Sequence, residues 1–208
     1  MKHATLIVAL VFAVAACNLT SKLRQSGSSN SNSSSSSTNP TKIGDDPVEK
    51  PAPTAAQTAA LANGQEVKWD QQGITWTLPP EWKKQSVSTN SFNFGGDGAF
   101  LIVNISPMDE SFPTEISLRG FHEGAKVRKK NGEVDQLKWL ELDGVRGVQF
   151  RESKPEDASG PRRLQWMTYR KYAGQTQLVN VMLSSSGNNF PKHLDEFYGI
   201  LYSTKLVH

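Results

Sequence analysis

The chain has 208 residues with 23 basic and 20 acidic side chains, so its formal net charge is only +3. This small surplus excludes the strongly basic class of nucleic-acid-binding proteins, which need cations concentrated on one face. The single cysteine, Cys17, excludes an internal disulfide framework of the kind that stabilises many small secreted domains.

The first residues have the pattern of a signal peptide. A basic start at Lys2 precedes an almost wholly apolar run from Ala4 to Ala16. A stable helix across about 30 Å of hydrocarbon needs about 20 residues, so this run is too short to be a permanent span. Residues 1–16 are therefore predicted to be a cleaved leader.

The leader ends in Val14-Ala15-Ala16-Cys17, which resembles the bacterial lipobox at all four positions. The resemblance implies that the Cys17 thiol carries a diacylglyceryl group and that the new N-terminus is acylated, and two or three chains make anchoring stable. The alternative is an ordinary signal peptide with a cysteine at its border. Asn18 stands where Gram-negative retention signals typically have Asp, so the resemblance implies the outer membrane, on its periplasmic or surface face, in a Gram-negative cell.

Residues 17–62 are predicted to form a disordered tether that begins at the lipidated cysteine. No aromatic residue occurs between Asn18 and Ala62, and the segment from Ser26 to Asn39 is almost entirely polar and small. Such a segment buries too little apolar surface to offset its conformational entropy. We expect a frayed helical turn at most from Thr54 to Ala62.

Residues 63–208 are predicted to form a single globular domain, because they hold all five Trp, all four Tyr and eight of the nine Phe residues. Alternating apolar positions and turn residues predict β-hairpins. The expected strands are residues 65–69 and 74–78, 86–94 and 99–105, 134–142 and 145–152, and 163–172 and 175–184, with turns at Asp143-Gly144 and Ala173-Gly174.

Two helices are predicted between and after these hairpins. The first runs from Pro113 to Lys130 and ends at Asn131-Gly132, a typical stop signal. Its expected apolar face is Ile116, Phe121 and Val127. The second runs from about residue 190 to 202, and its expected buried residues are Phe190, Leu194, Phe197 and Leu201.

Tight turns between consecutive strands predict antiparallel pairing, so the fold class is α+β, with an antiparallel sheet layered with helices. The segment from Ile74 to Lys83 and the ending Leu201-Tyr202-Ser203 resemble the PsbP-like fold. This resemblance implies an α/β/α sandwich over residues 65–205 and an accessory or assembly role. It gives no binding site that can be carried over residue by residue.

Sequence motifs for catalysis or metal binding are weak. His122-Glu123 resembles the start of an H-E-x-x-H zinc motif, but Lys126 replaces the second histidine, so exposed histidines are the expected reading. Adjacent acids such as Asp109-Glu110 are expected to be solvated. We therefore predict neither an enzyme nor a metal or cofactor other than the covalent lipid on Cys17.

The strongest candidate binding residues are basic. Four cations close the first helix and two begin a later strand, and together they predict a site for an anionic surface: Lys126, Arg128, Lys129, Lys130, Arg162 and Arg163. The structural alternative is that cations at a helix C-terminus stabilise the helix dipole.

These features predict a membrane-anchored binding or accessory module of the cell envelope. Its partners would be the membrane, through the lipid, and an envelope protein or polymer that the sequence does not name. The alternatives are an envelope enzyme whose site assembles from distant residues and a purely structural lipoprotein.

Overall fold

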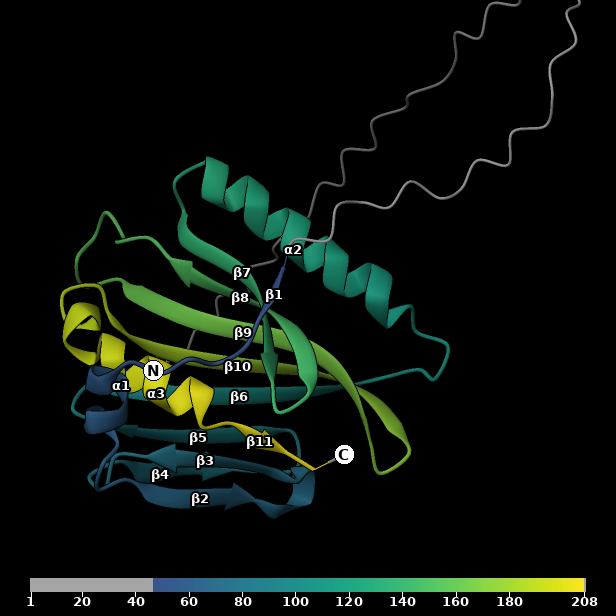
Figure 1. Cartoon of the computed structure of the whole chain (residues 1–208), viewed down its shortest axis with the longest axis horizontal. Coiled ribbons are helices and arrows are strands. Elements are labelled where there is room, and N and C mark those ends of the chain that lie inside the picture. Colours follow the sequence, from purple (N-terminus) through teal and green to yellow (C-terminus); the bar gives the residue numbers. More distant parts are fainter. Residues whose placement is uncertain (1–46, 208) are drawn as a thin grey trace, which may run out of the picture. The chain divides into compact units, whose positions relative to one another are not determined.

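A computed structural model of the chain describes residues 47–207 (Figure 1). The predicted leader, Cys17 and the tether up to residue 46 lie outside the described residues, as does His208. Within the described part, a large sheet contains, in spatial order, β1 (Val48–Glu49), β7 (Val134–Leu142), β8 (Val145–Glu152), β9 (Pro161–Tyr172), β10 (Gln175–Ser186), β6 (Ala99–Met108), β5 (Ser91–Gly96) and β4 (Lys83–Val87).

A second, small sheet contains β11 (Lys205–Leu206), β3 (Ile74–Leu78) and β2 (Gln65–Trp69), in that order. The α-helices are α1 (Ala55–Ala60), α2 (Thr114–Lys130) and α3 (Leu194–Tyr202), and short 3₁₀ turns η1 (Asp70–Gln72) and η2 (Phe190–His193) complete the elements. In the described residues every strand pair is antiparallel except β1 with β7. The predicted α+β class is confirmed.

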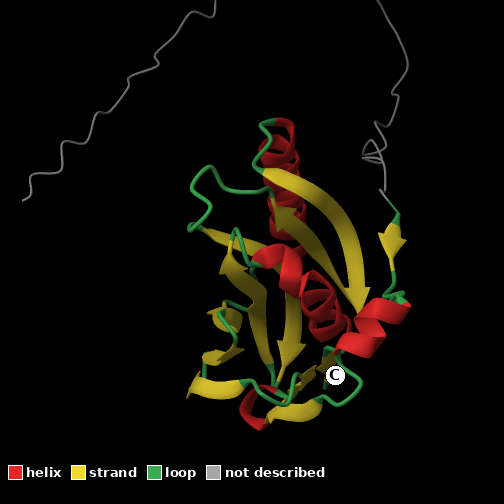
Figure 2. Ribbon diagram, turned by 90° about the vertical axis from the view of Figure 1, so that its left-hand side faces the viewer, coloured by secondary structure: helices red, strands yellow, loops and turns green. Residues whose placement is uncertain are grey.

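The large sheet has a different cover on each face. Helix α2 packs on β7, β8 and β9, whereas α3 and the small sheet lie on the opposite face. Figure 2 shows the curved strands of the large sheet between α2 and α3. Alternation along β9 produces both interfaces, since Leu164 and Trp166 face the small sheet while Met167 and Tyr169 face α2.

The strand turns match the sequence well. At Asp143-Gly144 the φ angles are +46° and +82°, and at Ala173-Gly174 they are +50° and +80°. Two consecutive positive φ values fit the right-handed twist of a hairpin, and glycine adopts the second without steric cost. These turns fix the register of β7 with β8 and of β9 with β10.

The predicted strand over residues 86–94 is wrong, because two strands replace it. β4 ends at Val87 and β5 begins at Ser91, and the chain turns between them. The Ser88 Oγ accepts hydrogen bonds from the backbone N–H groups of Asn90 and Ser91 at 3.4 and 3.1 Å. A serine side chain that caps its own turn in this way interrupts a strand.

The predicted apolar face of the first helix is also wrong in part. α2 buries Leu118, His122 and Ala125, whereas Ile116 is 73% and Val127 is 60% exposed. The buried positions follow the i, i+4, i+7 spacing of one helix face. Small Ala125 and aromatic His122 occupy that face, so the two aliphatic residues that suggested it lie on the other side.

The described end of the predicted tether is folded, contrary to expectation. Residues 47–62, called the N-terminal arm below, contain β1, which pairs with β7, and α1, which packs on α3. Thr54 and Gln57 form a capping box that stabilises the start of α1. The ordered chain therefore extends before the predicted boundary at residue 63.

Candidate binding surface around helix α2

The inner side of α2 is fixed by aromatic packing. His122, 3% exposed, stacks on Trp139 of β7 with ring centroids 4.5 Å apart. The guanidinium of Arg146 lies 4.9 Å from the centroid of the Trp139 ring. These contacts hold α2 in one orientation on the sheet, so its outer side has a defined composition.

The outer side of α2, called the outer face below, contains two exposed aliphatic residues. Ile116 and Val127 are 11 residues apart, which is about three helical turns, so they point in nearly the same direction about 16 Å apart. Between them lie Gly120 and Gly124, where an added Cβ would meet no atom within 4 Å. Within residues 47–207, nothing covers this part of the helix.

The structure brings two of the predicted cations together and places a third, Arg162, on the other face of the large sheet, over the Phe190 ring. Arg128 and Arg163 both contact the carboxylate of Glu152, at 3.3 and 3.1 Å, although they come from α2 and β9. Arg162 binds Asp135 at 2.6 Å. The sequence-predicted cluster therefore forms in part, but carboxylates from β7 and β8 partly compensate its charge.

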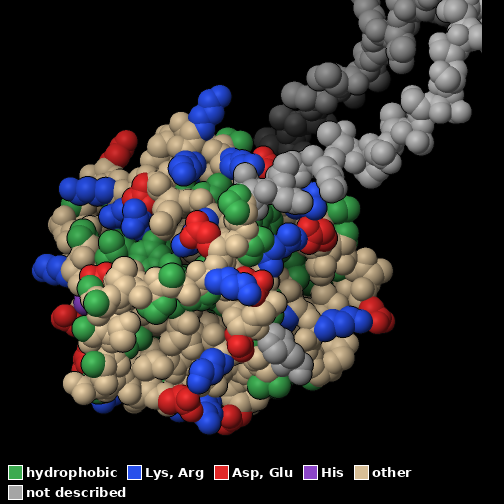
Figure 3. All heavy atoms as spheres, in the orientation of Figure 1, with side chains coloured by type: hydrophobic (Ala, Val, Ile, Leu, Met, Phe, Trp, Pro, Cys, Tyr) green, Lys and Arg blue, Asp and Glu red, His purple; other side chains and the backbone are tan. Residues whose placement is uncertain are grey.

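The remaining predicted cations lie on α2. Lys126 pairs with Glu123 at 3.0 Å. Lys129 and Lys130 are exposed in the last turn and form no ion pair with the rest of residues 47–207. Figure 3 shows Lys and Arg side chains gathered at the top of the view, over the C-terminal end of α2.

Helix α2 is the basic element of the domain. It contains five basic and two acidic residues, a net charge of +3. Residues 47–207 as a whole contain 19 basic and 18 acidic residues, a net charge of +1. The rest of the described chain therefore has a net charge of −2, and the positive charge is concentrated on this helix.

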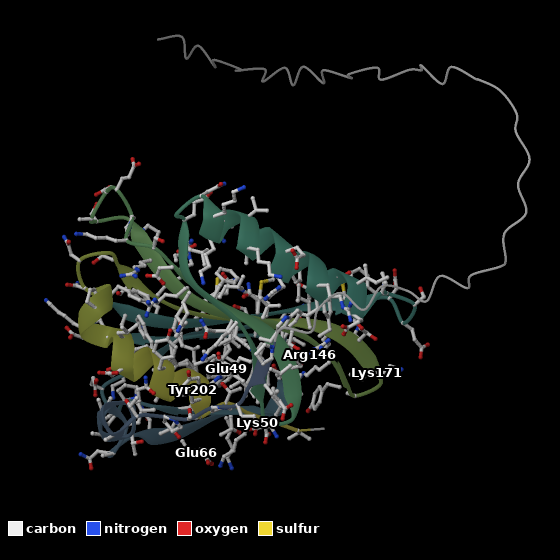
Figure 4. All side chains as sticks on the ribbon, turned by 45° about the horizontal axis from the view of Figure 1, so that its top comes forward. Glu49, Lys50, Glu66, Arg146, Lys171 and Tyr202 are labelled. Atoms are coloured by element: carbon white, nitrogen blue, oxygen red, sulfur yellow. The ribbon has the colours of Figure 1, made fainter. Side chains whose placement is uncertain are left out.

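The N-terminal end of α2 is fixed by a bidentate ion pair. Arg146 of β8 donates to both carboxylate oxygens of Glu115 at 2.5 and 2.6 Å. Its hydrogen bonds, with a further one from Arg119, hold the pKa of Glu115 below its usual value. A hollow of about 400 Å³ lies beside this pair, and Tyr169 and Lys171 line it. Figure 4 shows Arg146 and Lys171 near the strand ends below this part of α2.

A second polar group joins the N-terminal arm to the sheet. Lys138 of β7 contacts the Glu49 carboxylate at 2.8 Å and the Tyr202 hydroxyl at 3.3 Å. Burial works against its positive charge, but these partners outweigh burial and raise the pKa of Lys138. The labelled Glu49 and Tyr202 lie near each other in Figure 4. This group explains why β1 stays on the sheet edge.

The histidines differ from the sequence expectation of exposed side chains. His122 lies under α2, and His193 is 7% exposed with its Nδ1 3.3 Å from the Glu196 carboxylate. Burial raises the pKa of Glu196, although His193 counteracts this effect.

Between Pro47 and Val207 there is no group of three His, Cys, Asp or Glu side chains placed to hold a metal ion. In the same range, no helix is long and apolar enough to cross a membrane.

No family model matches the chain. No curated protein matches it either. Several solved structures are similar. LpqN of Mycobacterium tuberculosis, described as involved in cell envelope biogenesis, is 12% identical with a TM-score of 0.49, over 70% of this chain and 86% of LpqN.

Cyanobacterial PsbP from Synechocystis is 13% identical with a TM-score of 0.44, over 69% of this chain and 92% of that protein. A Bacteroides thetaiotaomicron protein is 9% identical with a TM-score of 0.46, over 70% of this chain, which spans only 49% of that protein. Likenesses this distant carry no information about what the chain binds or does.

The sequence reasoning missed the two aliphatic residues of the outer face. Ile116 and Val127 are apolar and were therefore expected in the core, yet they lie two and nine residues from Leu118, which places both on the opposite side of the helix. The available signal was the pair Gly120 and Gly124, which leaves that side of the helix without the large side chains of a core face.

Proposed function

We propose that the chain is a lipid-anchored binding or accessory module of the bacterial cell envelope. The observation that carries the proposal is the sequence Val14-Ala15-Ala16-Cys17 directly after an apolar leader. A thiol at that position is the acceptor of the lipid, and acyl chains then hold the mature chain at a membrane. The folded residues 47–207 are the part that meets a partner.

The surface of the domain supports a binding role. Helix α2 combines exposed aliphatic residues with a concentration of positive charge, and such a surface fits a partner that is anionic and partly apolar. A hollow of about 380 Å³ at its C-terminal end is lined by Glu133, Glu152 and Arg163 among others.

The proposal is tested by metabolic labelling with a fatty-acid analogue. The full chain, expressed in a bacterium with lipoprotein processing, should incorporate the label and fractionate with membranes. Cys17→Ala should lose both properties, because the chain then has no thiol. Asn18→Ala is the matched control, since it alters the next residue and leaves the four lipobox positions intact. Absence of label in the unchanged chain, or label retained in Cys17→Ala, contradicts the proposal.

A further inference from the structure

We infer that the outer face of α2 lies on an anionic lipid surface when the chain is anchored. The inference rests on the proposed function, because only an anchored chain meets lipid at high local concentration. The face consists of Ile116 and Val127, which are exposed, and is bordered by Lys130 of the last turn. The occupant is a bilayer with anionic phosphate headgroups.

Apolar exposure is the first argument. Ile116 and Val127 are exposed on the same side of α2, at 73% and 60%. A helix that lies in a membrane interface inserts aliphatic side chains to a shallow depth. Gly120 and Gly124 add no bulk beside them, and the one long side chain between them, Glu123, is paired with Lys126 at 3.0 Å.

Charge is the second argument. Helix α2 has a net charge of +3 while the rest of residues 47–207 has −2, so an anionic surface attracts this helix and repels the remainder of the domain. Lys130 is three residues after Val127, which places the two side chains about 60° apart around the helix. The aliphatic residue and the ammonium group therefore meet the lipid tails and the phosphates at the same edge of the helix.

The point at which the chain enters the domain is the third argument. The described chain begins at Pro47, directly before β1, and Val48 of β1 pairs with Trp139 of β7. Trp139 is the residue on which His122 of α2 stacks. Residues 18–46 connect Cys17 to Pro47, so 29 residues lie between the lipid and β1. The anchor thus connects to the sheet edge that α2 covers, and the outer face is within reach of the membrane.

The test uses a fluorophore on the full, lipidated chain. Because Cys17 is the single cysteine and its thiol carries the lipid, Val127→Cys provides the one free thiol for an environment-sensitive label. Val87→Cys on β4 is the matched control, since Val87 is also an exposed valine and lies at the opposite edge of the large sheet. Quenching by nitroxide-labelled lipid is measured on vesicles with and without phosphatidylglycerol.

We expect strong quenching at position 127 on anionic vesicles, weak quenching there on neutral vesicles, and weak quenching at position 87 on both. Adding Lys130→Glu should lower the ratio of docked to undocked protein by at least about fivefold, from roughly fivefold per lysine near an anionic surface. Lys83→Glu, at another exposed lysine, should leave the ratio nearly unchanged.

Three results overturn the inference. One is equal quenching at positions 127 and 87 in protein that still floats with the vesicles; the anchor then holds while the docking does not. The second is equal quenching at position 127 on neutral and anionic vesicles. The third is a shift of the label's spectrum without vesicles that depends on protein concentration, which assigns the face to a second copy of the chain. Failure to float with vesicles instead refutes the proposed function.

Discussion

Gly147→Ala on β8 is the substitution whose effect can be worked out most directly from the structure. A Cβ at position 147 would lie 2.4 Å from Nε1 and 2.5 Å from Cε2 of Trp166, and 2.7 Å from the backbone oxygen of Met167. Trp166 is fully buried, and its Nε1 donates a hydrogen bond to the Leu140 oxygen at 3.0 Å. The indole must therefore move, and its buried hydrogen bond is lost or strained.

The expected magnitude has two parts. Overpacking a core costs about 1–3 kcal/mol. Leaving a buried donor without its partner costs about 1–3 kcal/mol more. We therefore expect Gly147→Ala to lower the free energy of unfolding by about 2–6 kcal/mol. With a urea m-value of about 2 kcal/mol per molar for a small domain, the unfolding midpoint should fall by roughly 1–3 M.

Urea unfolding followed by tryptophan fluorescence measures this shift, because all five Trp residues lie in the domain. Gly124→Ala is the matched control, since the added methyl group there would meet no atom within 4 Å. It should raise the free energy of unfolding by about 0.5–1 kcal/mol, because alanine favours a helix over glycine. If the two variants shift the midpoint in the same direction, or Gly147→Ala leaves it unchanged, the packing of β8 against Trp166 is not as described.

Two further predictions concern the Glu115–Arg146 ion pair and the N-terminal arm. Glu115→Gln should lower the urea midpoint at neutral pH and have no effect at acidic pH. Arg146 lowers the pKa of Glu115 in the folded state. The ion pair therefore stabilises the fold above the unfolded-state pKa of Glu115, and this stabilisation is lost as the pH falls through its folded-state pKa. A midpoint difference that persists in acid contradicts this. Gly199→Ala should loosen the N-terminal arm, because its Cβ would lie 2.8 Å from the Gln57 oxygen and 3.0 Å from Leu61 Cδ1. Limited proteolysis should then cut residues 47–62 faster. Unchanged cleavage would count against the contact between α1 and Gly199.

The strands and turns could be predicted because their signals are local. Asp143-Gly144 requires positive φ angles wherever it occurs, and alternating side chains in β3 reveal a half-buried strand without any tertiary information. The arm was missed for the opposite reason. Val48 and Glu49 form a strand only because β7 offers a free edge, and two residues have no strand signal of their own.

The candidate binding surface, like the fold, could be predicted only in part from the sequence. A run of cations from residue 126 to 130 is visible in the sequence, but which of them is compensated depends on partners far along the chain. Glu152 neutralises Arg128 from 24 positions away, and Asp135 reaches Arg162 across 27. Lys129 and Lys130 point in other directions around the helix than Arg128 and form no ion pair within residues 47–207. Sequence alone therefore gave the cations of the surface but not the subset that a partner can use.

The attachment of β1 has a mechanical consequence. Tension that arrives along the chain from before Pro47 acts first on β1, which is held by two residue pairs and the contacts of Lys50 and Lys138. The next attachment is α1 on Gly199, and only then does the load reach β2. Because the arm lies at an edge and only Leu61 of it packs against a core cluster, it can peel away and lengthen the chain by about 16 residues, or roughly 50 Å, before the sandwich unfolds.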